Sequence, residues 1–400
     1  MDKSELPDFF ANYAENKMNL LRIVLLPLIV CAVARPLRAE HRVGDTVVVV
    51  HDAKIKVQNK VVQEVRRGVG LKVQAVEGDW LWVSNQGAGW LHVRDVATPT
   101  QAIAIFSEQI KKDPRDSDAF VCRGLAWLNK QEIDIAIADF NEAIRLNHTN
   151  ASAYSSRAIC WWTKREVDKA IADDTEAIRL DSREPMYLAN RGILWNMRGD
   201  YDKAVADAEA ALRLNPSLVT AHVVRGNALV RQREYTRAVA AFEAAMQINP
   251  REAAVYGLRG RVLAARGDYQ AALQDFDKAL KLDPKDKDAN NEIARFYAIC
   301  PADDYRDGAK AVEFARRACE LSNWRWASSI GVLAAAYAEQ GDFEQAVEWQ
   351  VKATNMVEGN RRDEFEARLK LFKAHRPLRE MPVNASRVEK RKEATAKTAE

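Results

Sequence analysis

A spacing of 34 residues recurs through most of this 400-residue chain. Small residues mark the same point of each unit, at Gly124, Ala158, Gly192, Gly226, Gly260 and Ala294. In the first five units alanines follow 12 and 19 residues later, and in all six a bulky residue follows after 3. Small side chains at fixed depths let two helices approach closely. Because a unit of two helices and a turn cannot bury its apolar face alone, the period predicts a solenoid of stacked helix pairs.

The turns between the expected helices carry recurring signals. Arg-Gly-Asp-Tyr occurs at 198–201 and 266–269, and prolines end the second helix at Pro216, Pro250 and Pro284. With these residues, the chain from 117 to 359 resembles the tetratricopeptide repeat family. The resemblance implies about seven repeats in an all-α superhelical solenoid, the sixth with an insertion at 301–308. Some units depart from the pattern, at His148, Asp174, Ser182 and Ala208.

The segment before the repeats has a different periodicity. Apolar residues alternate with period two between Val43 and Val96, and glycines interrupt the pattern, which predicts a small β-barrel over 41–97. The run Gly-Asp-Trp-Leu-Trp-Val at 78–83 and Gly-Trp-Leu-His at 89–92 resembles the bacterial SH3-like family. The aromatic signature with which eukaryotic SH3 domains bind proline-rich ligands is missing, so that activity is not implied. At least one of the tryptophans is expected to be exposed or to cover a neighbouring domain, among Trp80, Trp82 and Trp90.

The predicted fold is therefore multidomain, a small all-β SH3-like barrel followed by an all-α solenoid of tetratricopeptide repeats. Residues 100–115 have the spacing of a second repeat helix, so a half-repeat connects the two domains without a linker. Residues 361–376 carry one apolar stripe and predict a capping helix. The polar residues 377–400 predict a disordered tail.

The N-terminal residues 1–39 predict export. An apolar run from Ile23 to Ala34 is shorter than the roughly 20 residues that span a bilayer, and small residues follow it, as in a secretory signal peptide. Acidic residues precede the run, so Met18 is the expected true start and the mature chain is expected to begin near Arg35 or Glu40. The predicted location is the periplasm, the cell envelope or the extracellular space. The alternative is an uncleaved segment that anchors the chain in the membrane.

The composition offers little support for catalysis or for nucleic-acid binding. The net charge of +3 is small, and no basic stripe with interleaved aromatic residues occurs. The six histidines are scattered, the cysteines lack metal-ligand spacing, and no phosphate-binding or dinucleotide-binding motif occurs. We therefore expect a protein that is not an enzyme and that needs no cofactor and no metal.

One polar pattern repeats with the units. Arginines precede the small residue, and an aspartate follows sixteen residues after each, in the pairs Arg123 and Asp139, Arg157 and Asp173, Arg191 and Asp207, and Arg259 and Asp275. Arg225 has Ala241 at the acid position. The arginines could form an anion-binding ladder, but the matching period of the acids favours a structural Arg–Asp ladder inside the solenoid.

The family resemblance places ligand binding on the concave face, which the first helix of each repeat lines. The period assigns to this face Trp162, Asn196, Asn227, Arg231, Arg261, Asn291 and Arg295. The Lys and Asn arrangement that clamps a carboxylate in some relatives is not reproduced. We expect an adaptor of the bacterial cell envelope that binds a peptide or protein segment in this groove. The alternative is a cell-wall module whose barrel binds peptidoglycan and whose repeats dock an enzyme.

Overall fold

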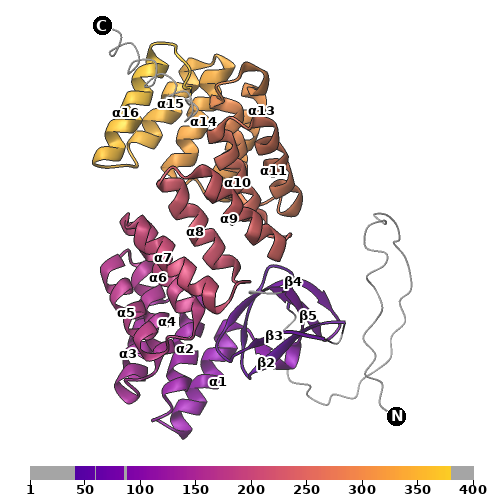
Figure 1. Cartoon of the computed structure of the whole chain (residues 1–400), viewed down its shortest axis with the longest axis vertical. Coiled ribbons are helices and arrows are strands. Elements are labelled where there is room, and N and C mark those ends of the chain that lie inside the picture. The colour runs from indigo at the N-terminus through magenta and orange to yellow at the C-terminus, as the bar shows by residue number, and fades with distance from the viewer. Residues whose placement is uncertain (1–40, 59, 85–87, 380–400) are drawn as a thin grey trace, which may run out of the picture. The chain divides into compact units, whose positions relative to one another are not determined.

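The computed structural model describes residues 41–58, 60–84 and 88–379, so the predicted signal region and most of the predicted tail lie outside it. Within the described chain, contacts define two compact units, one ending at Asp181 and the other beginning at Ser182 (Figure 1). The sequence predicted a division between barrel and repeats. The first of the two compact units contains the β-domain, residues 41–97, together with the first helix pairs, against which it packs directly.

The β-domain is a single antiparallel sheet with the strand order β3-β2-β6-β5-β4-β1-β7. Its strands are β1 (Thr46–Val49), β2 (Ala53–Val57), β3 (Lys60–Val65), β4 (Gly70–Glu77), β5 (Trp80–Ser84), β6 (Ala88–His92) and β7 (Val96–Ala97). The period-two pattern sends Leu81 and Leu91 into the core, where both are fully buried. The alternate residues of the same strands lie on the outer face of the sheet.

Sixteen α-helices follow in the part of the chain that the structure describes. The first unit contains α1 (Pro99–Lys112), α2 (Ser117–Asn129), α3 (Ile133–Leu146), α4 (Ala151–Thr163) and α5 (Val167–Leu180). The second unit contains α6 (Pro185–Arg198), α7 (Tyr201–Leu214), α8 (Val219–Arg231), α9 (Tyr235–Ile248), α10 (Ala253–Arg266), α11 (Tyr269–Leu282), α12 (Lys287–Ile299), α13 (Gly308–Leu321), α14 (Ala327–Gln340), α15 (Phe343–Thr354) and α16 (Asn360–Lys373). The predicted all-β region followed by a helical solenoid is confirmed.

Where the partner helix carries a phenylalanine, the small residue of the repeat makes room for its ring, at Gly124, Gly226 and Gly260. A Cβ added to Gly124 would lie 2.6 Å from the Phe140 ring, and one added to Gly226 would lie 2.6 Å from the Phe242 ring. The second repeat has Ala158 at the small position and Asp174 in place of phenylalanine. Asp174 is buried and accepts a hydrogen bond of 2.7 Å from Ser155, so a polar contact replaces the ring there.

The insertion at 301–308 is anchored on both sides. Tyr305 packs against Tyr269 and Phe296, with ring centroids 5.5 and 5.9 Å apart. Arg306 donates to Glu339 on α14 over 2.9 Å. These contacts hold the longer turn against its neighbours.

The ordered chain also extends beyond the predicted capping helix. The sequence predicted disorder from residue 377, but Leu378 packs against the core of the last helix pairs. Arg379 lies 2.6 Å from a carboxylate oxygen of Glu339. This apolar contact and this ion pair hold the segment Arg376–Arg379 against α14, so the prediction is wrong for its first residues.

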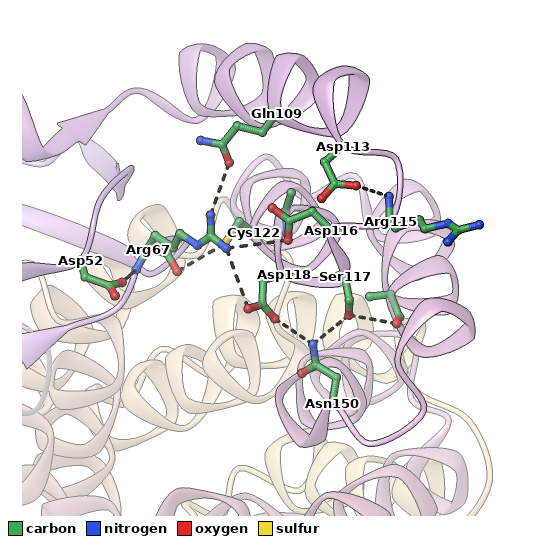
Figure 2. Close-up of polar contacts among 12 residues, drawn as sticks. Asp52, Arg67, Gln109, Asp113, Arg115, Asp116, Ser117, Asp118, Cys122 and Asn150 are labelled. Atoms are coloured by element: carbon green, nitrogen blue, oxygen red, sulfur yellow. Dashed lines mark hydrogen bonds and ion pairs between the residues drawn. The ribbon is translucent and has the colours of Figure 1, made fainter.

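The turn between β3 and β4 docks the β-domain onto α2 (Figure 2). The Arg67 guanidinium lies 3.8 Å from carboxylate oxygens of both Asp116 and Asp118, and the Arg67 carbonyl accepts from the Cys122 thiol over 3.6 Å. A Cβ added to Gly68 would lie 3.1 Å from the Cys122 Cα, so the two backbones approach closely.

The docked turn covers part of the face on which the sequence placed the groove. Counting from Ser117, the contacted residues Asp118, Leu125 and Asn129 occupy the second, ninth and thirteenth positions of the first repeat. Gly68 packs on Leu125, and Gly70 packs on Asn129. The β-domain therefore takes up this face of α2.

Candidate functional site

We use "groove face" for the second, fifth, ninth, twelfth and thirteenth residues of each first helix. In the second unit the first helices contact one another directly, α6 with α8, α10 with α12 and α12 with α14. Small residues dominate the groove face of α10 and α14, at Ala254, Gly257, Ala264, Ala265, Gly331, Ala335 and Ala338. Apart from Gly257 itself, its two chain neighbours and the nearby backbone of its own helix, no atom lies within 4 Å of the point where a Cβ on Gly257 would stand, although the residue itself is buried. The groove face therefore has room for side chains of a ligand near Gly257.

The structure brings together two of the three groove arginines. Arg295 donates to Glu292 from Nε and from Nη2, over 3.2 and 3.0 Å, and Arg261 lies 3.8 Å from the same carboxylate. Arg231 instead donates to the hydroxyl of Tyr201 over 3.1 Å and lies over its ring. Glu292 was not among the predicted site residues, and only its place one residue from a groove position could have pointed to it.

The other predicted groove residues differ in their surroundings. Asn196 donates to the carbonyl of Val224 on the next first helix over 3.0 Å, so its amide group joins α6 to α8. Asn227 is half-buried on α8. Asn291 has a buried carbonyl oxygen without a hydrogen-bond partner among the described residues. Trp162 lies on α4 in the first unit, and 43% of its surface is exposed.

A cavity of about 140 Å³ lies at the C-terminal end of the groove face in the second unit. Its walls come from α12, α14, α16 and the segment Arg376–Arg379, namely Arg295, Ile299, Gly331, Val332, Ala335, Arg368, Leu378 and Arg379. Arg295 is the only predicted site residue among them. Arg368, Leu378 and Arg379 lie beyond the last predicted repeat, which is why the sequence missed them, whereas Ile299, Gly331 and Ala335 occupy groove-face positions that the prediction did not single out.

The Arg–Asp pairs lie inside the helix layers and not on the groove face. The four guanidinium groups each make two hydrogen bonds of 2.7–2.9 Å to the carboxylate sixteen residues later, as fork-to-fork pairs. Their aspartate side chains are 6–10% exposed. The hydrogen bonds to these aspartates raise the pKa of Arg123, Arg157 and Arg259 further above its usual range.

The same arginines also reach the preceding helix pair. Arg123 donates to Ser107 over 3.3 Å, Arg157 to Asn141 over 2.7 Å and Arg259 to Glu243 over 3.3 Å, in each case sixteen residues earlier. One guanidinium therefore joins two successive second helices. The sequence pattern indicated the later partner and missed the earlier one.

Arg225 lacks the acid, and its surroundings differ accordingly. Its Nη2 lies 3.4 Å from Nδ1 of His222, whose Nε2 lies 2.9 Å from the carbonyl of Pro216. Burial, and secondarily the charge of Arg225, lower the pKa of His222, while the contact with Pro216 opposes them. His222 is therefore held in its neutral form, with Nε2 as the donor.

His222 is expected to make the free energy of unfolding decrease as the pH is lowered. Since the folded pKa is below the unfolded value of 6.5, the unfolded chain binds the proton first as pH falls, so the stabilisation is present above pH 6.5 and is lost below it. His222→Asn should flatten this dependence, because Asn290 donates to the carbonyl of Pro284 at the same repeat position. Urea unfolding of both proteins between pH 7.5 and 5 measures the difference. Parallel curves would contradict the assignment.

Other chemistry has little support in the described chain. The cysteines at 122, 160, 300 and 319 are thiols, and burial raises the pKa of Cys122, Cys160 and Cys319 to about 12, so these three stay protonated. Residues 41–58, 60–84 and 88–379 contain no group of three His, Cys, Asp or Glu side chains that could hold a metal. In the same ranges, no helix has the length and apolar character needed to cross a membrane.

Comparison with known proteins identifies similarity in the helical part. Tetratricopeptide repeat family models match residues 123–185 and 197–253, residues 226–292 and residues 326–357. No curated protein matches the chain. None of these family matches includes the β-domain.

Solved structures share the fold of the helices. The APC/C hetero-tetramer Cut9–Hcn1 is similar over 60% of this chain and 46% of its own, with 18% identity and a TM-score of 0.53. Yeast Tom70 is similar over 73% of this chain and 62% of its own, with 18% identity and a TM-score of 0.50. The chain thus spans less than two thirds of either protein. At 18% identity, the similarity shows a shared fold and nothing more.

Proposed function

We propose that this chain, whose helical part carries tetratricopeptide repeats, is a non-enzymatic scaffold of the bacterial cell envelope that binds a segment of a partner protein. Proteins built from this repeat are generally interaction scaffolds without catalytic activity. The ligand would lie along the groove face of the second unit.

One observation carries the proposal, the combination of free space and charge on this groove face. No neighbouring atom fills the space at the Cβ point of Gly257, and a cavity of about 140 Å³ follows further along the face. Arg261 and Arg295 meet at Glu292 between these two points along the chain. A surface with apolar space and a few fixed polar groups suits an extended protein segment.

Export supports the envelope location in this proposal. The apolar run at 23–34 and the small residues after it have the features of a signal peptide, and this region lies outside the described residues. N-terminal sequencing of the native protein tests the location. A start near Arg35 or Glu40 supports export with cleavage, whereas a start at Met1 or Met18 would favour the membrane-anchored alternative.

A side chain placed in the open part of the groove face tests binding. Gly257→Leu should leave the thermal midpoint within about 2 °C of the wild type or above it, because the new side chain enters open space and leucine favours helices. It should also reduce capture of partners from a native envelope extract by at least about tenfold, which is 1.4 kcal/mol. The matched control is Lys278→Leu, on the exposed side of α11. Undiminished capture by folded Gly257→Leu would refute groove binding.

A second candidate function involves the outer face of the β-domain, which we interpret as an SH3-like barrel. Trp82 and Trp90 lie with ring centroids 5.2 Å apart, and Trp80 and His92 lie 5.0 Å apart, all four half-buried. Neighbouring, partly exposed aromatic rings suit contact with sugar rings. This face favours peptidoglycan as a ligand, with the repeats then docking a partner enzyme.

Sedimentation with purified cell wall tests this second function. The full chain should sediment with the wall, and Trp80→Ser should remain soluble if the aromatic face binds the glycan. Lys54→Ser, a change at an exposed position of β2, is the control. If the wild type does not sediment with the wall, the wall-binding function is wrong and the scaffold proposal is unaffected.

A further inference from the structure

The cavity at the C-terminal end of the groove face is large enough for one side chain. A cavity of about 150 Å³ holds a benzene molecule, so 140 Å³ accommodates an aliphatic or small aromatic side chain. Ile299, Val332 and Ala335 supply apolar walls from α12 and α14. These walls favour a side chain without polar atoms.

A missing side chain on α14 keeps this space open. A Cβ added to Gly331 would lie 3.3 Å from the ring of Phe365 and 3.8 Å from Nη1 of Arg368. At the corresponding fifth position, α12 carries the larger Asn291. Since Gly331 lines the cavity, a bulky residue there would fill it.

Three arginines from three different elements surround the apolar walls. Arg295 belongs to α12, Arg368 to α16 and Arg379 to the segment Arg376–Arg379. Arg368 donates from Nη2 to Glu364, one turn earlier on its own helix, so its Nη1 side faces Gly331. A guanidinium has five N–H donors and one carboxylate accepts only some of them, so a second carboxylate can bind beside the first.

We propose that this cavity anchors a partner segment in which an aliphatic side chain stands next to acidic residues. The aliphatic side chain enters the cavity, and the neighbouring carboxylates bind Arg368 and Arg379. Arg295, Arg368 and Arg379 are each paired with a glutamate, namely Glu292, Glu364 and Glu339, so a basic segment would have to compete with them for these carboxylates and is disfavoured. This inference rests on the proposed function and adds the chemistry of the ligand.

Fluorescence anisotropy with labelled peptide pools tests the chemistry. One pool of 12-residue peptides combines Asp and Glu with Leu, Ile and Val, a second has Lys in place of the acids, and a third has Ser in place of the aliphatic residues. In 0.15 M salt, the full chain should bind the first pool at least about tenfold more tightly than either of the others. Equal binding of the three pools, or binding of none, would overturn the proposal.

Variants of the full chain locate the site. Gly331→Leu fills the cavity, and Arg368→Gln removes one charge. Each variant should bind the acidic–aliphatic pool at least about tenfold more weakly than the wild type. Arg237→Gln on α9, 57% exposed, should bind it as the wild type does. Because Gly331→Leu also crowds Phe365, Arg368→Gln keeps the test informative if the first variant is unstable. Full binding by both folded variants would exclude this cavity.

Two further comparisons separate the remaining possibilities. If a chain ending at Arg379 binds the acidic–aliphatic pool more than tenfold tighter than the full chain, residues 380–400 are the occupant and the partner assignment is wrong. If both variants no longer bind the acidic–aliphatic pool but still capture the native partner, the cavity does not anchor that partner. The scaffold function would then stand without this inference.

Discussion

Arg259→Ala is expected to lower the free energy of unfolding by about 3 to 5 kcal/mol. The substitution leaves the Asp275 carboxylate, 6% exposed, without the two hydrogen bonds of 2.7 Å that it accepts from Arg259. It also removes the contact with Glu243 on the preceding second helix. An uncompensated buried carboxylate is the main cost.

Matched arginines distinguish this cause from a general loss of packing. Arg225→Ala should lower the free energy of unfolding clearly less than Arg259→Ala, because Ala241 stands at the acid position of that repeat. Arg191→Ala should be intermediate, since Trp195 still donates to Asp207 over 2.9 Å. Arg231→Ala, at an exposed position, should stay within about 0.5 kcal/mol. Urea unfolding followed by circular dichroism measures all four, and equal losses for Arg259→Ala and Arg225→Ala would refute the structural role of the pairs.

Phe242→Ala is expected to cost about 3 to 5 kcal/mol, because the fully buried ring fills the gap that Gly226 leaves between α8 and α9. Gly226→Ala alone should cost about 1 to 3 kcal/mol, since its Cβ would lie 2.6 Å from the ring. In the Phe242→Ala background the same glycine substitution should become neutral or stabilising. There the ring is gone and alanine gains about 1 kcal/mol in helix propensity.

A double-mutant cycle on the unfolding free energies measures this coupling. Gly257→Ala is the control, because it adds the same Cβ to a helix at a point with no atom within 4 Å, and it should stabilise by about 0.5 to 1 kcal/mol. If the effects of Gly226→Ala and Phe242→Ala on the free energy of unfolding are additive, the Phe242 ring is not the reason why position 226 requires glycine. Among the repeats, Ala158 occurs in the unit that has Asp174, whereas Gly192 occurs in the unit that has Ala208, where an added Cβ would instead lie 2.8 Å from Val224.

The repeat period by itself determined the helix pairs. Because each unit repeats the same spacing, a residue's place in one unit predicts its depth and its partner in the next, as with the arginines and the acids sixteen residues later. The alternation around Trp80 and Trp82 likewise predicted strands, and the structure places both on the outer face with Leu81 between them in the core. Local periodicity therefore carries secondary structure and contacts within a repeat.

Contacts between segments with no common period were decided by the tertiary structure. No pattern in the sequence relates Arg67 to Asp116 and Asp118, and so the covering of α2 by the β-domain could not be predicted. The same holds for Arg379 and Glu339, which bring a segment predicted to be disordered into the wall of the cavity. Such contacts depend on where the chain returns in space after a turn or a helix end, and a repeat pattern contains no information on that path. The sequence therefore determined the scaffold and the groove face, whereas packing alone decided which part of the face is covered and where the cavity lies.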